Sequence, residues 1–320
     1  MSRDVIAFDL GGTNVRCGLV SEDGKILVRA KHAVGKKPKP EDAAAQMAEM
    51  AKKLLKEANK RHDEVACAGI GSPGPLNSQT GIIVETPNLG WKNVPLAKLV
   101  QDGIGIPTYL ENDANSACWG EYMRGAGKGT QTMFILTLGT GVGGGLILGG
   151  KLWKGIDDIA GHLGHIVVDP DGPKQVFDNP GSLEALCSAT ALIRDAKAAA
   201  KEHPKSKLAK LAEDEVNGQT VAECAEAGDK VALDLFERLG RHLGIACASF
   251  ANVLNPEAGV IGGGLAASWK LFAPAMQKEM KRRALGPAGA RLKLHQAKLG
   301  DDAGMTGVAG LALLRLDGKL

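Results

Sequence analysis

The segment LENDANSACWGE, residues 110–121, places Asn112 and Asp113 where an apolar strand gives way to a helix. A carboxylate at such a junction can serve as a general base toward a bound hydroxyl group. The simplest structural explanation is an N-cap, because aspartate is common at the start of helices. The residues alone leave both interpretations open, and phosphate-binding elements elsewhere in the chain would favour the general base.

Two glycine-rich turns provide such elements, DLGGTNVR at 9–16 and LGTGVGGG at 138–145. Their glycines leave backbone N–H groups free to meet phosphate oxygens, and Thr13 and Thr140 add hydroxyl donors. Asp9 could hold Mg²⁺ directly or through water. A ligand-free hairpin is the alternative for either turn alone, but two turns at matching places favour phosphate binding. The second turn also matches the dinucleotide pattern G-x-G-x-x-G, yet a strand follows it where that motif needs a helix.

A third stretch, GHLGHIVVDPDGPKQVFDNPGSLE at 161–184, holds two histidines three residues apart, His162 and His165, and ends on Glu184. A His-x-x-His pair is weak evidence for a metal by itself. The stretch is therefore consistent with part of a metal site, part of a substrate pocket, or only a loop.

Composition limits the classes of protein to consider. A chain of 320 residues with 44% hydrophobic and 23% charged residues is typical of two globular domains. The net charge of +3 is too small to favour nucleic-acid binding. No apolar run resembles a signal peptide or a membrane span, and the six cysteines form no C-x-x-C pair, so we expect a cytoplasmic protein with reduced thiols and no membrane partner.

Hydrophobic periodicity places the three motifs on alternating strands and helices. In the first half we expect three antiparallel strands, a helix from Glu41 to His62, a strand at 64–71, a helix ended by Gly103, and a strand at 106–113. In the second half we expect strand, turn and strand at 132–153, helices at 183–202 and 229–253, a strand at 258–264, and a final helix from about Gly304. The matching starts of the two halves predict a duplicated α/β unit.

The order and spacing of several motifs along nearly the whole chain resemble the ROK family of sugar kinases and sugar-responsive repressors. These motifs are DLGGTNVR, GIGSPGPLN, TPNLGW, LENDANSACWGE, LGTGVGGGLILGGKLWKG, AGHLGH, GSLE and NPEAGVIGGGL. The resemblance implies the α/β actin-like ATPase fold, with two ribonuclease-H-like lobes around a central cleft. The small lobe would span 1–115 together with a C-terminal helix at 304–320 that packs back on it, and the large lobe would span 116–303. The first strand starts at about Asp4, which leaves no room for the helix-turn-helix of the repressors.

The resemblance further implies an ATP-dependent kinase that phosphorylates the 6-hydroxyl of a hexose. Asp113 would be the general base, a role that an aspartate of near-normal pKa can fill because the hydroxyl loses its proton only late. The residues implied in sugar binding are Asn88, Asn112, Asp113, His162, His165 and Glu184. The residues implied in cradling ATP are Gly11, Gly12, Thr13, Thr140, Gly141, Gly262, Gly263 and Gly264, with Asp9 serving Mg²⁺.

Many family members hold a structural zinc with a histidine and three cysteines in this third stretch. Counting from His165, the cysteine positions are occupied here by Gln175, Phe177 and Ser182, and Cys187 lies outside the pattern. Structural zinc sites are built from four Cys or His ligands, so we expect no zinc. We expect the turn to be held by its Asp, Asn and Pro residues and by packing of Phe177.

The preferred sugar depends on a position where this chain departs from the family pattern. Most hexose-specific members carry GELGH where this chain has GHLGH, so His162 replaces a glutamate that accepts hydrogen bonds near carbons 1 and 2 of the sugar. Some N-acetylmannosamine kinases have AGHIGH, which makes an N-acylhexosamine kinase the alternative. GIGSPGPLN and TPNLGW resemble the loops of glucokinases and favour glucose. A non-catalytic sugar-sensing protein is a further alternative, and a homodimer is expected because relatives are often homodimers.

Overall fold

The computed structural model describes residues 3–35, 37–174 and 179–320. The chain forms two compact units. The first unit comprises residues 1–129, 145–161 and 298–320, and the second comprises 130–144 and 162–297. Within the described ranges, no helix is both long and apolar enough to cross a membrane.

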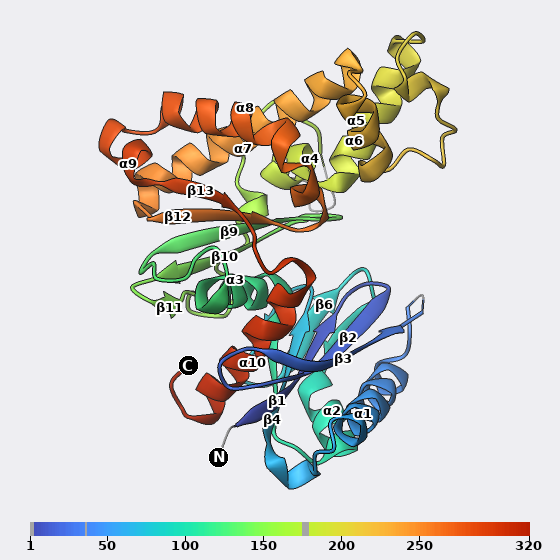
Figure 1. The fold of residues 1–320 in the computed structure, drawn as a ribbon, viewed down its shortest axis with the longest axis vertical. Helices are drawn as coiled ribbons and strands as arrows, with labels where there is room; N and C mark the ends of the chain where they lie inside the picture. The colour runs from blue at the N-terminus through green and yellow to red at the C-terminus, as the bar shows by residue number, and fades with distance from the viewer. Residues whose placement is uncertain (1–2, 36, 175–178) are drawn as a thin grey trace. The chain divides into compact units, whose positions relative to one another are not determined.

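The first unit is built on a five-stranded sheet of order β3-β2-β1-β4-β8 (Figure 1). Its strands are β1 (Asp4–Leu10), β2 (Asn14–Val20), β3 (Ile26–Ala33), β4 (Val65–Ser72) and β8 (Thr108–Asn112). A small ribbon consists of β5 (Leu76–Asn77), β6 (Ile82–Thr86) and β7 (Trp91–Val94). The helices are α1 (Pro40–Glu57), α2 (Leu96–Ile104), α3 (Asp113–Arg124) and α10 (Ala303–Leu316), with a 3₁₀ turn at His62–Glu64 and another at Gly300–Asp302.

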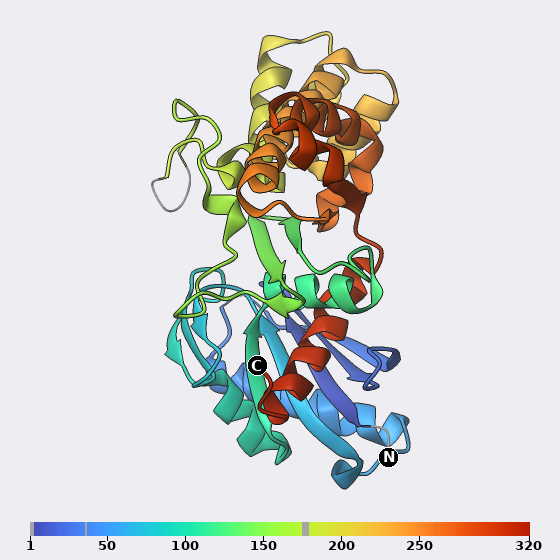
Figure 2. The same ribbon diagram turned by 90° about the vertical axis from the view of Figure 1, so that its left-hand side faces the viewer.

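The side chains of β1 alternate between the two faces of this sheet, because successive residues of a strand point to opposite sides. Both faces are buried. Ile6, Phe8 and Leu10 belong to a core cluster that includes residues of α1 and α2. Val5 and Ala7 belong to a second cluster that includes residues of α10. Figures 1 and 2 show α1 and α2 on one side of the strands and α10 on the other. The final helix α10 thus packs on the N-terminal strands.

Small residues let α10 lie directly against α3. A Cβ on Gly307 would come 1.6 Å from the carbonyl oxygen of Ser116, and one on Gly120 would come 2.2 Å from that of Ala303. The predicted lobe boundaries lie at residues 115 and 304, whereas the first unit runs to residue 129 and resumes at residue 298. Helix α3 groups with the first unit because its backbone is in van der Waals contact with α10.

The second unit contains most of a sheet of order β11-β10-β9-β12-β13, the same order as in the first unit. Its strands are β9 (Met133–Leu138), β10 (Val142–Leu148), β11 (Lys151–Leu152), β12 (Ala258–Gly262) and β13 (Lys293–Gln296), with the end of β10 and all of β11 counted in the first unit. Its helices are α4 (Leu183–Cys187), α5 (Ala189–Glu202), α6 (Gly218–Glu226), α7 (Lys230–Leu254), α8 (Trp269–Arg283) and α9 (Gly286–Arg291). Short 3₁₀ helices lie at Leu163–His165, Leu208–Lys210 and Gly264–Ser268. The repeated strand order confirms the predicted duplication.

Three helix boundaries differ from the predicted ones, each for a local backbone reason. Helix α1 ends at Glu57 and not near His62, and Asn59 then turns the chain with φ of 52°. Helix α2 runs through Gly103 and is ended by Gly105, whose φ of 67° is the left-handed conformation of a helix C-terminus. The predicted helix 183–202 is two helices, because Ser188 adopts an extended conformation and caps the second one.

Candidate functional site

Asp113 is the first residue of α3, directly after the end of β8. Asn112 is the N-cap, and its Oδ1 accepts hydrogen bonds from the N–H groups of Ala114 and Asn115 at 3.0 and 3.1 Å. Because Asn112 caps the helix, Asp113 is not needed for that role. One of its oxygens accepts from the Ala114 N–H at 2.8 Å. The N-cap explanation for Asp113 is therefore wrong, and its carboxylate is available for chemistry.

The pKa of Asp113 is raised to about 6, chiefly by burial and secondly by the nearby negative charge of Asp9. Hydrogen bonds from the backbone N–H of Ala114 oppose the rise without cancelling it. The pKa of Asp113 is thus higher than the near-normal value that would suffice for a base, because burial penalises the charged carboxylate. A base with a pKa close to neutral pH is both ionised and able to take up a proton.

Asp9 is the penultimate residue of β1, and it forms an ion pair with Arg16 at 3.1 Å. Arg16 in turn contacts Asp301 at 2.8 Å. Burial nevertheless raises the pKa of Asp9, so one guanidinium does not fully offset the cost of its charge. The carboxylate of Asp9 has the oxygen atoms that Mg²⁺ prefers as ligands, and a further cation there would offset the cost of its charge.

The first glycine turn has free donors where the sequence predicts them. The N–H of Gly11 already donates to the carbonyl of Asn14 at 2.8 Å, so Gly11 shapes the turn and does not offer its N–H. The N–H groups of Gly12 and Thr13 have no acceptor among the described residues. The exposed Asn88 lies beside this turn, since a Cβ on Gly12 would be 3.7 Å from its Cβ. The turn therefore presents two backbone donors and one amide side chain.

The second glycine turn joins β9 to β10, and its Gly139 N–H donates to the carbonyl of Gly141 at 2.9 Å. The N–H groups of Thr140 and Gly141 have no acceptor within the described part of the chain. Glu184 packs against this turn, where its Oε2 accepts from the Val142 N–H at 2.8 Å. A Cβ at 141 would lie 2.2 Å from that oxygen, so a larger residue there would displace the Glu184 side chain from the turn. Glu184 thus uses one carboxylate oxygen to hold the turn.

The glycines after β12 lie next to the second turn. Gly263 has φ of 82°, and a Cβ there would come 2.4 Å from the carbonyl oxygen of Leu138. A Cβ on Gly264 would meet nothing within 4 Å, and Gly262 is still part of β12. The segment therefore lies against the end of β9, and the backbone of Gly264 has open space beside it.

His162 and His165 flank a short 3₁₀ helix, and their ring centroids are 6.1 Å apart. The pKa of His162 is lowered, mainly by burial and further by His165, while the charge of Glu184 acts in the opposite direction. His162 is therefore neutral at pH 7, with one ring nitrogen as donor and the other as acceptor. Glu184 is close enough to influence it, so these three predicted residues lie in one region of the second unit.

The turn after His165 closes through backbone hydrogen bonds. Val168 N–H donates to the carbonyl of Gly181 at 2.9 Å, and Leu183 N–H donates to that of Ile166 at 2.9 Å. Ser182, at a cysteine position of the zinc motif, is the N-cap of α4. Gln175 and Phe177 lie outside the described residues, so the predicted packing of Phe177 stays a prediction. Among the residues that the structure describes, no three His, Cys, Asp or Glu side chains gather as metal ligands.

The predicted residues thus fall into two groups. In the first unit Asp9, Gly12, Thr13, Asn88, Asn112 and Asp113 come from the ends of β1 and β8, the turn before β2 and the turn after β6. In the second unit Thr140, Gly141, His162, His165, Glu184 and Gly262–Gly264 share one region. Sequence reasoning missed Arg16, Glu111 and Lys154, although a glutamate in the apolar strand before Asn112 is a signal that could have been used.

Comparison with known proteins identifies the family. The model of the ROK family matches residues 5–315. The chain belongs to the ROK family. Two curated members, the glucokinases of Streptomyces coelicolor and Thermotoga maritima, are each 36% identical to it, over 96% and 98% of both chains.

Solved ROK structures agree with the fold. A glucokinase of this family from Streptomyces griseus, solved in complex with glucose and AMPPNP, is 33% identical and superimposes with a TM-score of 0.82 over 97% of this chain and 99% of that one. The two α/β units with matching sheets are therefore the actin-like ATPase fold of the ROK sugar kinases, as the sequence resemblance implied.

Proposed function

We propose that this chain is an ATP-dependent glucokinase that transfers the γ-phosphoryl group of ATP to the 6-hydroxyl of glucose. The observation that carries the proposal is a carboxylate at the start of α3 with a pKa of about 6, in a chain that also has two turns with free N–H groups. Family members about a third identical over nearly their whole length are glucokinases, which supports the same substrate here.

In the proposed reaction Asp113 accepts the proton of the 6-hydroxyl while that oxygen attacks the γ-phosphorus, and the bond to the β-phosphate bridging oxygen breaks. Phosphoryl transfer has a loose transition state, so positioning and charge stabilisation account for most of the catalysis. The N–H groups of Gly12, Thr13, Thr140 and Gly141 would bind phosphate oxygens. Asn88, Asn112, His162, His165 and Glu184 would bind sugar hydroxyls.

The residues present also fit a magnesium ion. Asp9 is buried enough for its pKa to be raised despite Arg16, so its carboxylate would gain from a further cation. Mg²⁺ bound there with ATP would neutralise phosphate charge. We propose Asp9 as its ligand, directly or through water, and we propose no zinc.

The alternative substrate is N-acetylmannosamine, and one observation favours it. His162 is a neutral imidazole at the position of a family glutamate, so it can donate as well as accept near carbons 1 and 2. An acetamido carbonyl would accept that hydrogen bond. Glucose remains the primary proposal because the two curated relatives that are 36% identical to this chain along nearly its whole length are glucokinases.

A coupled assay of ADP release with MgATP tests the proposal across glucose, mannose, fructose, N-acetylglucosamine and N-acetylmannosamine. We expect glucose to have the highest kcat/KM. The highest value for N-acetylmannosamine would support the alternative. Turnover of none of them, with glucose binding intact in calorimetry, would show a non-catalytic sugar-sensing protein.

Asp113→Asn tests the role of the base. We expect kcat to fall by about 10²–10⁴-fold, the usual contribution of general base catalysis, while the Kd for glucose changes little. Asparagine keeps the oxygen that accepts from the Ala114 N–H but cannot accept the proton. Steady-state kinetics and calorimetry give the two values, and turnover near that of the parent would remove Asp113 as the base.

We also propose that the chain is a homodimer. Sedimentation velocity at several micromolar concentrations checks this, and a single species at the monomer mass would contradict it.

A further inference from the structure

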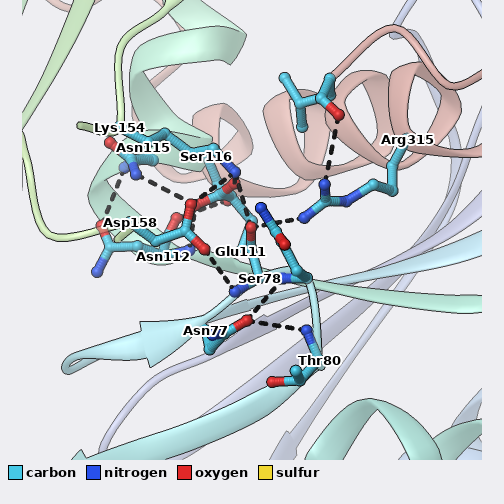
Figure 3. A network of polar contacts seen from close by, with 12 residues as sticks. Asn77, Ser78, Thr80, Glu111, Asn112, Asn115, Ser116, Lys154, Asp158 and Arg315 are labelled. Atoms are coloured by element: carbon cyan, nitrogen blue, oxygen red, sulfur yellow. Dashed lines mark hydrogen bonds and ion pairs between the residues drawn. The ribbon is translucent and has the colours of Figure 1, made fainter. Parts of the chain in front are cut away.

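Glu111 precedes the proposed catalytic Asp113 by two residues, near the end of β8, and is 3% exposed. One carboxylate oxygen accepts hydrogen bonds from the Asn112 N–H at 2.9 Å and from the side-chain amide of Asn115 at 3.1 Å. Asp113 lies between these two residues in the chain. The carboxylate of Glu111 therefore ties together both ends of the turn that presents Asp113 (Figure 3).

The other oxygen of Glu111 depends on a single cation. It is buried and has no hydrogen-bond partner among the described residues, but the Nζ of Lys154 lies 3.3 Å away. Lys154 comes from the segment after β11, more than thirty residues further along the chain. Removing one partner of a buried ion pair is strongly destabilising, so the position of the Glu111 carboxylate depends on Lys154.

Lys154 is itself held by groups that do not touch Asp113. Its side chain is 12% exposed, it contacts Asp158 at 3.1 Å, and it donates to the hydroxyl of Ser78 at 2.7 Å. Asp158 accepts from the Ser78 N–H at 2.8 Å, and Arg315 of α10 donates to the same hydroxyl at 2.7 Å. Figure 3 shows the ammonium group between Glu111 and Asp158, with Ser78 below them. The ammonium group is therefore fixed and points at Glu111.

We propose that Lys154 is a positioning residue for phosphoryl transfer, which acts by holding the carboxylate of Glu111 in place and so fixing the turn that carries Asp113. With that carboxylate held by the ammonium group, the Asn112 N–H and the Asn115 amide are held at one point. Without Lys154, the carboxylate of Glu111 is free to turn away, and Asp113 loses its fixed direction. This inference rests on the proposed kinase function.

The first test compares Lys154→Met with Asp158→Asn in the full chain. Both variants disturb the same buried cluster, but only Lys154→Met removes the cation from Glu111. We expect Lys154→Met to lower kcat at least about tenfold, with a glucose KM within about threefold of the parent, since misplacing a catalytic group costs rate more than binding. Asp158→Asn lowers Tm and leaves kcat within about twofold, because the polar contacts of Asp158 with described residues are to Lys154 and Ser78.

Two further variants separate positioning from folding. Lys154→Arg keeps a cation and should recover most of the lost kcat. Glu111→Gln combined with Lys154→Met removes both charges while an amide oxygen can still accept from the Asn112 N–H, so it should have a higher kcat than Lys154→Met alone. A kcat of Lys154→Met within twofold of the parent, measured where it is folded, would overturn the proposal, as would an equal loss in Asp158→Asn.

Hydrogen exchange tests the same inference without turnover. The amides of Asn112, Ala114 and Asn115 should exchange at least about tenfold faster in Lys154→Met than in the parent, and at the parent rate in Asp158→Asn. Unchanged exchange at these amides in Lys154→Met would overturn the inference. If the parent phosphorylates no sugar, the proposed function fails, and the exchange rates still decide whether Lys154 positions the turn.

Discussion

At the scale of single residues, the proposed base combines two opposing requirements. Asp113 must be ionised to accept a proton, yet burial and the charge of Asp9 raise its pKa to about 6. In unfolded protein an aspartate has a pKa of about 3.9. The folded chain therefore binds this proton more tightly than the unfolded chain does, and the ionised carboxylate lowers stability at neutral pH.

This difference predicts a stabilising effect of the inactivating variant Asp113→Asn. Because the folded pKa is the higher one, the cost of the charge is complete above about pH 6 and absent below about pH 4. We expect the variant to be more stable than the parent by about 1–3 kcal/mol at pH 8 and equally stable at pH 4. Urea unfolding without Mg²⁺ at both pH values measures this, and a pH-independent difference would contradict the raised pKa.

His162 carries a prediction about specificity. Glutamate at this position would only accept hydrogen bonds, whereas the neutral imidazole of His162 also donates one. We expect His162→Glu to raise the ratio of kcat/KM for glucose over N-acetylmannosamine by about tenfold, which corresponds to about 1.4 kcal/mol. Competition assays with both sugars measure the ratio. An unchanged ratio would place His162 outside the sugar pocket.

At the scale of elements, the close packing of α10 on α3 fixes the turn that carries Asp113. The Cβ positions at Gly307 and Gly120 are already filled by backbone atoms of the other helix, so no rotamer change can relieve a larger residue there. The sequence predicted the final helix but not this contact, because glycines in a helix usually indicate low helix propensity.

Gly307→Ala is therefore expected to destabilise the protein by at least about 3 kcal/mol, the upper end of overpacking costs, despite the better helix propensity of alanine. Gly286→Ala is the matched control, since a Cβ there meets nothing within 4 Å. We expect its effect to stay within about 0.5 kcal/mol. Chemical denaturation of both variants checks this, and equal stability of the two would mean that the helices separate easily.

At the scale of the whole molecule, each unit carries its own set of predicted binding residues. A ligand that binds only the folded chain raises its stability by about 2.7 kcal/mol at a concentration of 100 Kd. Glucose and a non-hydrolysable ATP analogue should therefore each raise Tm by several degrees, in the parent and in Asp113→Asn. Differential scanning fluorimetry measures the shifts, with mannitol at equal concentration as control. No shift with glucose would contradict a glucose site.

The sequence by itself determined the succession of strands and helices, the duplication, the family and the two glycine turns, because these follow from local periodicity, turn chemistry and ordered motifs. It also placed Asp113 at the start of a helix. Only the tertiary structure decided the raised pKa of Asp113, the use of Gly11 within its own turn, and the ion pair of Lys154 with Glu111. The physical reason is that burial and charge pairing depend on segments far apart in the chain, such as β8, the residues after β11, and α10.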